Sequence, residues 1–250
     1  MSFIATFDAA GILKQIVDGV KPLVSEVNLV CDEHGMSFQA MDASHVSLCS
    51  VKIRGEALAH YSCTSTMVLG LPLLHVDKIL STIHPTDRLT LEAEGSMLHL
   101  SVVRDTRVSE FSLHLMTIEQ EQIEIPPVDP SQQHCSCNMP SSVFQKTIRD
   151  LALLGDRCSL TFRPGEVCFS TTGNIGSGHL TLKSTQDVEV TALAETSGDF
   201  ATRYLALFAK CGNVAPSVSI AMLDKQPLRI RYCSAFASLE FFLAPRIDDL

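Results

Sequence analysis

A helix-like segment near the start of the sequence is the first indication of the fold class. Residues 12–22 read ILKQIVDGVKP, in which apolar side chains recur at the spacing of an amphipathic helix until Pro22 ends the run. Short strand-like alternations of apolar and polar residues follow at residues 27–30, 36–40 and 46–53. The sequence therefore predicts one helix followed by several short strands that turns connect.

The second half of the chain repeats this order. A helical pattern occupies residues 143–151 after Pro140-Ser141-Ser142, which we expect to cap its N-terminus. The strand-like segments that follow are residues 157–162, 167–171 and 179–183. The two halves are therefore expected to fold alike.

Each half then shows a second short helix and closing strands. The helices are expected within residues 74–83 and 204–208, and the strands at residues 89–93, 97–103, 218–222 and 228–232. Strands outnumber helices and are joined by turns, which favours antiparallel sheets. The expected fold class is α+β, with two similar domains of antiparallel sheets and paired helices.

A segment between the halves is typical of a linker. Residues 117–133 are rich in Glu and Gln and contain Pro126, Pro127 and Pro130, without an apolar period. We therefore predict a domain over residues 1–117, a connector over residues 118–134 and a domain over residues 135–250.

Composition limits the function classes. The chain has 250 residues and 27.2 kDa, with 46% hydrophobic and 19% charged residues, which excludes a disordered chain. No run of 18 apolar residues occurs, and charged residues interrupt the first twenty positions, so we expect neither a membrane span nor a secretion signal. The nine cysteines form no CxxC pair, which indicates a reducing compartment.

The overall charge argues against a nucleic-acid binder, but its distribution does not. The formal net charge is −9 and the pI about 5.4, and the chain has no Trp. Yet the predicted helices carry cations opposite their apolar stripes, at Lys14, Lys21, Lys78, Lys146, Arg149, Arg203 and Lys210. These residues could instead be an ordinary solvated face, since Asp18, Asp77 and Asp150 dilute the pattern.

The segment after the second predicted strand is more specific. Residues 38–48 read FQAMDASHVSL, and this segment closely resembles the eukaryotic DNA sliding clamp family, the proliferating cell nuclear antigen family. Further collinear segments resemble the family over essentially the whole chain, among them residues 11–14, 78–80, 108–111, 125–126, 139–141, 149–151, 176–180, 203–205 and 243–247.

The resemblance implies the DNA clamp fold and a non-enzymatic function without cofactor or metal. Three chains would close head to tail into a ring in the nucleus, with residues 107–115 of one subunit against residues 177–183 of the next. A clamp loader would place this homotrimer around double-stranded DNA, where it would serve as a processivity factor for DNA polymerase and as a docking platform for replication and repair proteins. The seven helical cations would face the phosphates without reading the bases.

The resemblance also implies a groove for the clamp-interacting peptide of partner proteins. The residues that would form it are Met41, His45, Val46, Leu48, Ile123, Ile125, Pro126, Pro227, Ala244, Pro245, Arg246 and Ile247. Aliphatic and aromatic side chains of the peptide would fill an apolar pocket there and supply most of the binding energy. The alternative is that these positions are ordinary core and loop residues.

The chain departs from the family pattern in a few places. Gln15 and Ser81 stand where lysines are usual, and the connector is longer, with His134 or Cys135 at the position of an aromatic residue. Cys168 replaces the lysine that receives ubiquitin-type modification in relatives, so that modification is not expected here.

Other functions remain as alternatives. Asp42, Ser44 and His45 could suggest a hydrolytic triad, but neighbouring residues of a strand point to opposite faces. The segment 134–137 could hold a metal but lacks a second ligand cluster, and the glycines of residues 173–178 are expected to form a turn. The closer alternative is a subunit of a heterotrimeric checkpoint-type clamp.

Overall fold

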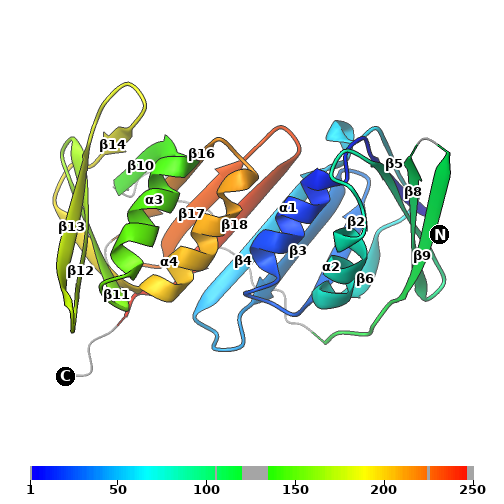
Figure 1. Cartoon of the computed structure of the whole chain (residues 1–250), viewed down its shortest axis with the longest axis horizontal. Helices are drawn as coiled ribbons and strands as arrows, with labels where there is room; N and C mark the ends of the chain where they lie inside the picture. Colours follow the sequence, from blue (N-terminus) through cyan, green and yellow to red (C-terminus); the bar gives the residue numbers. More distant parts are fainter. Residues whose placement is uncertain (1, 105, 120–134, 224–225, 247–250) are drawn as a thin grey trace. The chain divides into compact units, whose positions relative to one another are not determined.

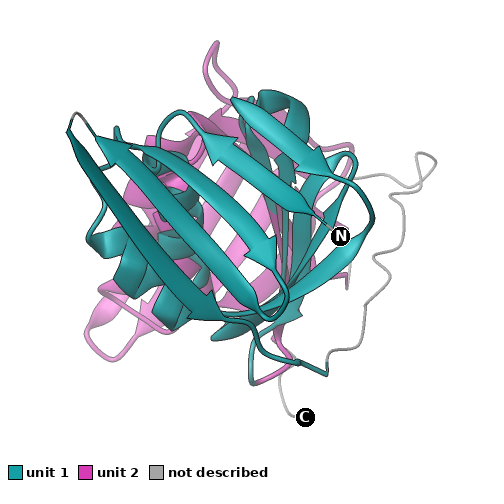
Figure 2. Ribbon diagram, turned by 90° about the vertical axis from the view of Figure 1, so that its right-hand side faces the viewer, with its two compact units in different colours: residues 1–43, 49–123, 234–239 teal, residues 44–48, 124–233, 240–250 magenta. Residues whose placement is uncertain are grey.

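The computed structural model describes residues 2–104, 106–119, 135–223 and 226–246. The chain divides into two compact units, which Figure 2 colours separately. Unit 1 comprises residues 1–43, 49–123 and 234–239, and unit 2 comprises residues 44–48, 124–233 and 240–250. The predicted connector, residues 118–134, falls almost entirely outside the described residues.

The first half of the chain alternates strands with two helices (Figure 1). In order, its elements are β1 (Phe3–Phe7), α1 (Gly11–Val20), β2 (Glu26–Asp32), β3 (Gly35–Met41), β4 (Ser47–Arg54), the 3-10 turn η1 (Gly55–Ala57), β5 (His60–Cys63), β6 (Met67–Pro72), α2 (Leu73–Ser81), β7 (Arg88–Glu94), β8 (Met97–Arg104) and β9 (Arg107–His114). One antiparallel sheet has the strand order β5-β1-β7-β8-β9, and a second sheet has the order β4-β3-β2-β6.

The helices of unit 1 cover its second sheet. In Figure 1, α1 and α2 lie side by side in front of β2, β3 and β6. Both helices are amphipathic, and their buried apolar residues are Ile16, Val17, Val20, Leu73, Val76 and Leu80. Burial of such a side chain stabilises a fold by about 1.5–3 kcal/mol, so this interface fixes which helix faces remain exposed.

The second half repeats the plan. Its elements are β10 (Cys135–Pro140), α3 (Ser141–Ala152), β11 (Arg157–Arg163), β12 (Glu166–Gly173), β13 (Gly176–Lys183), β14 (Glu189–Thr191), β15 (Thr196–Ala201), α4 (Thr202–Ala209), the 3-10 turn η2 (Lys210–Asn213), β16 (Ser217–Met222), β17 (Leu228–Cys233) and β18 (Ala237–Leu243). One antiparallel sheet has the order β13-β12-β11-β15, and another the order β14-β10-β16-β17-β18.

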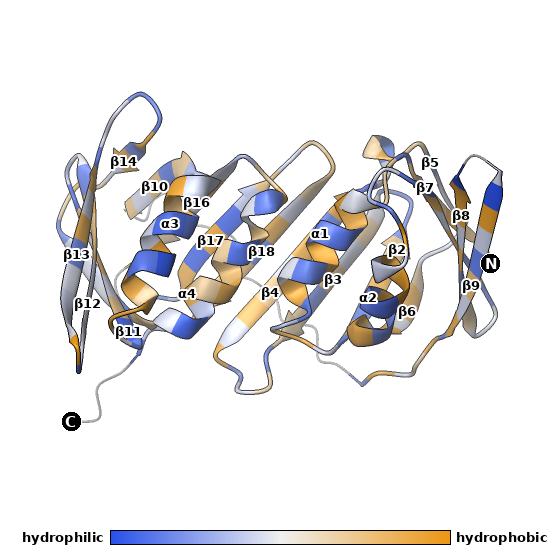
Figure 3. Cartoon of the chain, in the orientation of Figure 1, coloured by the Kyte–Doolittle hydropathy of each residue, from blue (hydrophilic) through white to orange (hydrophobic). Residues whose placement is uncertain are grey.

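Aromatic side chains fill the core of unit 2. Phe208 of α4 stacks on Phe241 of β18 with 4.6 Å between ring centroids, and Phe144 of α3 is fully buried. Figure 1 shows α3 and α4 side by side in front of the strands of this unit. The exposed sides of the helices therefore lie opposite this apolar layer, and Figure 3 shows hydrophilic residues distributed along α1 and α3.

The predicted fold class, α+β with antiparallel sheets and paired helices, is confirmed. Three local predictions were wrong. Ser141 does not cap α3: its hydroxyl donates to the carbonyl oxygen of Ala215 at 2.7 Å, a tertiary bond that the local sequence does not reveal. Ile83 lies beyond the end of α2, where it is buried, and Lys210 belongs to η2 rather than to α4.

Two features of the described residues limit the kind of site. None of their helices is long and apolar enough to cross a membrane. Nor do the described His, Cys, Asp and Glu side chains gather in a group of three or more that could hold a metal ion.

Candidate nucleic-acid interface

The cations of unit 1 lie on the helix faces that the core leaves exposed. Lys78 is exposed on α2, Lys14 is half-buried on α1, and Lys21 directly follows α1. The amphipathic spacing of each helix produces this placement, because the residues between the apolar positions must point away from the sheet.

Lys21 differs from the other two lysines because two carboxylates hold it. Its Nζ lies 2.7 Å from an oxygen of Asp18 and 2.7 Å from an oxygen of Asp77. The hydrogen bond to Asp18, followed by the one to Asp77, raises the pKa of Lys21 above its usual range. Since Asp18 belongs to α1 and Asp77 to α2, Lys21 ties the two helices together, and these carboxylates offset two of the three lysine charges.

Unit 2 presents more net positive charge on its helices. Lys146 and Arg149 are exposed on α3 and share one carboxylate, that of Asp150, at 2.8 and 3.8 Å. The hydrogen bond from Lys146 lowers the pKa of Asp150. Pairs this exposed contribute little to stability, so the cations stay available to other anions.

The remaining two cations of unit 2 are also exposed. Arg203, on α4, lies over the ring of Tyr204 with 4.9 Å to the ring centroid, and Lys210 begins η2. These helical residues of unit 2 thus include four cations and one carboxylate, Asp150, which pairs with Lys146 and Arg149. The corresponding residues of unit 1 include three cations and two carboxylates, both of which pair with Lys21.

The predicted groove residues are only partly described. Ile123, Ile125, Pro126 and Ile247 lie outside the described residues. In unit 1, Met41 ends β3 half-buried. The other described members belong to unit 2: Val46 is half-buried, Leu48 is buried in β4, and His45 and Pro227 are exposed.

Two backbone hydrogen bonds fix the groove residues near the C-terminus, Ala244 and Arg246. The backbone N–H of Ala244 donates to the carbonyl oxygen of Val46 at 3.0 Å, which brings the two predicted residues together. The N–H of Arg246 donates to the carbonyl oxygen of Asp199 at 2.7 Å, and Pro245 between them is half-buried. His45 has a φ of +55°, a left-handed conformation that few residues other than glycine adopt. The groove as a whole stays a prediction.

In each unit, one strand of interest lies at the edge of its sheet. β9 is the last strand of its sheet and β13 the last of its own, and both alternate exposed with half-buried residues. A bare edge presents unpaired N–H and C=O groups to another chain. The exposed Val108 on β9, and Ile175 in the turn before β13, add apolar surface at these edges.

Two of the alternative sites have structural explanations. Gly173 and Gly176 pair across the β12–β13 hairpin, so this segment forms the predicted turn between strands. A Cβ at Gly173 would lie 1.9 Å from the carbonyl oxygen of Leu154, so close packing accounts for this glycine. Cys135 and Cys137 are buried in β10, and burial raises the pKa of Cys137 to about 12, which makes it a core side chain.

Comparison with known proteins explains this arrangement. The family model described as "Proliferating cell nuclear antigen, N-terminal domain" matches residues 2–123, and the one described as "Proliferating cell nuclear antigen, C-terminal domain" matches residues 127–247. The chain belongs to the proliferating cell nuclear antigen family. It is thus a member of a family of non-catalytic DNA sliding clamps of replication and repair.

Individual relatives match along nearly their full length. The chain is 33% identical to the proliferating cell nuclear antigen of Chaetomium thermophilum, covering 98% of each chain, and 33% identical to that of Dictyostelium discoideum, covering 96% of this chain and 97% of the relative. It is 31% identical to proliferating cell nuclear antigen 2 of Plasmodium falciparum, covering 94% and 96%. The crystal structure of the proliferating cell nuclear antigen of Entamoeba histolytica superposes with a TM-score of 0.91 at 27% identity, covering 98% and 99%.

The contacts of Lys21 are what sequence reasoning missed at this site. Asp18 and Asp77 were evident as acidic residues on the helices, but Asp77 is 56 positions from Lys21 along the chain. Only the packing of α1 against α2 brings them together. The family resemblance predicted the position of the cations and could not predict which of them are already neutralised.

Proposed function

We propose that this clamp acts as a homotrimer that encircles duplex DNA, holds a DNA polymerase on its template and gives docking sites to replication and repair proteins. The observation that carries the proposal is the pair of bare edge strands, β9 in unit 1 and β13 in unit 2. A head-to-tail contact that closes into a ring would pair both edges in every subunit.

The charge distribution supports DNA as the molecule inside the ring. Three chains would carry three times −9, or −27, and would repel DNA on average. Only a surface on which cations are gathered can hold phosphates. On or directly after the helices α1 to α4 lie Lys14, Lys21, Lys78, Lys146, Arg149, Arg203 and Lys210. Contacts to phosphate alone carry no sequence information, so the ring can slide.

The oligomeric state and the function of the cations can be tested together. Light scattering on the purified chain should give about three times 27.2 kDa, the mass of a closed trimer. Primer extension with a polymerase and a clamp loader should lengthen products, and the variant Lys78→Glu/Arg149→Glu should abolish this gain while remaining a trimer. A stable monomer that requires other subunits would instead indicate a checkpoint-type heterotrimer, and unchanged stimulation by the variant would refute the DNA-facing assignment.

We further propose that partner proteins, polymerase among them, bind through a short clamp-interacting peptide at the groove defined above, and that the chain acts in the nucleus. The bond between Ala244 and Val46 supports the groove, since it holds two of its predicted members at one place in unit 2. Isothermal titration with a peptide that carries the family's interaction motif should show saturable binding. Binding should weaken when Val46 is replaced by Asp, and the absence of titratable heat with the unmodified chain would count against the groove.

A further inference from the structure

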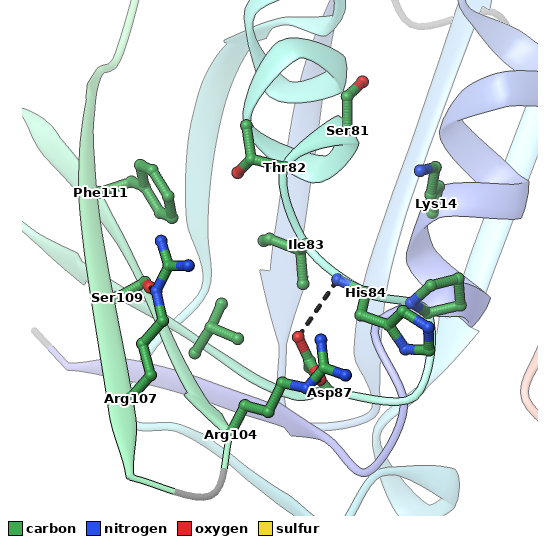
Figure 4. A pocket seen from close by; sticks show the side chains of 12 residues that line it. Lys14, Ser81, Thr82, Ile83, His84, Asp87, Arg104, Arg107, Ser109 and Phe111 are labelled. Atoms are coloured by element: carbon green, nitrogen blue, oxygen red, sulfur yellow. Dashed lines mark hydrogen bonds and ion pairs between the residues drawn. The ribbon is translucent and has the colours of Figure 1, made fainter.

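Unit 1 contains a cavity of about 390 Å³ that includes Lys14, one of the cations assigned to duplex DNA, together with two arginines that are not assigned to it (Figure 4). Its wall is built from Lys14 of α1, from residues at and after the end of α2, and from the β8–β9 hairpin. The polar and charged side chains that line it include Lys14, Ser81, His84, Arg104 and Arg107. Figure 4 shows these side chains arranged around a common space.

The described residues that line the cavity carry more positive than negative charge, although the chain as a whole is strongly negative. Among its described lining residues, Lys14, Arg104 and Arg107 carry permanent positive charges and Asp87 carries the negative one, which leaves an excess of two cations. The side chain of Asp87 is only 9% exposed. It accepts a hydrogen bond from the backbone N–H of His84 at 3.2 Å and lies 3.6 Å from Nε of Arg104. The carboxylate of Asp87 is therefore already paired within the wall of the cavity.

The two arginines are held in a position that favours an anion between them. Arg104 and Arg107 stand directly opposite each other at the end of the β8–β9 ladder. Like charges at such a pair of positions are destabilising, and a bound anion removes this cost. Nε of Arg107 donates to the hydroxyl of Ser109 at 3.1 Å, which orients the guanidinium.

The remainder of the wall strengthens the charge effect. Ile83 and Val102 are buried and Phe111 is half-buried, so apolar groups lie beneath the cations. An ionic interaction is stronger beside apolar groups than in open water, because the local dielectric constant is lower there. The volume is within the range of about 300–1,000 Å³ typical of small-molecule sites.

We propose that this cavity is a binding site for a phosphate-bearing anion. The guanidinium groups of Arg104 and Arg107 match the geometry of phosphate oxygens, and Lys14 supplies a third positive charge. Neither arginine belongs to the seven cations assigned to duplex DNA. The inference rests on unit 1 alone and does not require that the ring forms.

Isothermal titration of the full chain with pyrophosphate, at constant ionic strength, tests the site. We expect saturable binding of one pyrophosphate per chain. The variant Arg104→Gln/Arg107→Gln should weaken binding at least tenfold. The matched control Arg163→Gln removes an arginine that pairs with Glu195 in unit 2 and is 47% exposed, similar to the 55% of Arg104, and it should bind as tightly as the unmodified chain.

Two further measurements keep the test decisive. Light scattering must give the same mass for the variants, which separates loss of the site from any failure of the ring. Amide chemical shifts should move on addition of pyrophosphate at residues 81–84 and 107–111, which locates the site without any substitution. No saturable heat, equal weakening by Arg163→Gln, or shifts confined to other residues would overturn the proposal.

A competition experiment identifies the source of the phosphate. If a short DNA duplex displaces pyrophosphate, the natural ligand is a backbone phosphate of DNA. If pyrophosphate remains bound at saturating duplex, the ligand is a free phosphorylated compound. Both results support the anion site.

Discussion

Asp77→Asn should lower the stability of the chain and raise its affinity for duplex DNA at the same time. The substitution keeps the shape of the side chain and removes one of the two carboxylates that hold Lys21 at 2.7 Å. Since the side chains of Lys21 and Asp77 are 27% and 21% exposed, the pair is partly buried. A charged hydrogen bond of this kind contributes about 1–2 kcal/mol, between the values for exposed and for buried pairs. For a chain of this size the melting temperature should fall by about 2–8 °C.

The effect on DNA follows from the same contact. Without Asp77 the helices of unit 1 carry one negative charge less, and Lys21 keeps only its pair with Asp18, whose side chain is 46% exposed. A phosphate can compete with such an exposed pair for Lys21. One additional phosphate contact makes the plot of log K against log salt steeper by about 0.9, which corresponds to about a three- to fourfold larger loss of affinity between 50 and 200 mM salt. Fluorescence anisotropy of a labelled duplex over this salt range measures the slope.

The control is Glu94→Gln, which removes the same charge from an exposed position at the end of β7, away from the helices. It should change neither the melting temperature nor the salt dependence. The hydrogen bonds that raise the pKa of Lys21 also define a pH dependence. Because the pKa of Lys21 is higher in the folded than in the unfolded chain, its protonated form stabilises the folded chain. This stabilisation is complete below the unfolded pKa of about 10.4 and is lost as pH rises above that value. The stability difference between wild type and Asp77→Asn should therefore persist at neutral pH and shrink above that value. Equal salt slopes for Asp77→Asn and wild type would refute the account of Lys21.

Three further predictions concern unit 2. The hydrogen bond from Arg157 lowers the pKa of Asp199, so the ionised Asp199 stabilises the fold above about pH 4 and this stabilisation is lost as pH falls further. In urea melts, Asp199→Asn should therefore have a smaller free energy of unfolding than the wild type near pH 7 and a weaker decline of it below pH 4. A decline equal to that of the wild type would contradict this. Gly173→Ala should cost about 1–3 kcal/mol in the same melts, because its Cβ would meet the carbonyl oxygen of Leu154, and an unchanged midpoint would count against that packing. Native-state labelling with a maleimide, read by mass spectrometry, should modify the exposed Cys233 first and spare the buried Cys137, whose raised pKa keeps it a thiol; early modification of Cys137 would show that β10 opens.

Periodicity in the sequence predicted the helices and those strands that bury one face. The stretch at residues 12–22 predicted α1 nearly to its ends because its apolar residues recur at helical spacing. Residues 157–162 predicted β11 because apolar and polar positions alternate there. β10 was missed because its sequence, CSCNMP, looks polar, although Cys135 and Cys137 act there as small apolar residues.

That cations lie on the exposed helix faces could be predicted from the sequence, but their ion pairs could not. The helical cations followed from amphipathic spacing and from the family resemblance. The ion pair between Asp77 and Lys21 depends on tertiary packing. Tertiary packing also places Lys14, Arg104 and Arg107 in the wall of one cavity. Such contacts join residues far apart in the chain, and no local pattern specifies them.

Enclosure of DNA by the proposed ring can be measured as retention of the loaded clamp on nicked circular DNA, by gel filtration in high salt before and after a single cut linearises the circle. We expect the clamp to stay with the circle and to be released once the ends are free, because the phosphate contacts alone are weak in high salt. Equal retention on circular and linear DNA, or no retention on either, would contradict it.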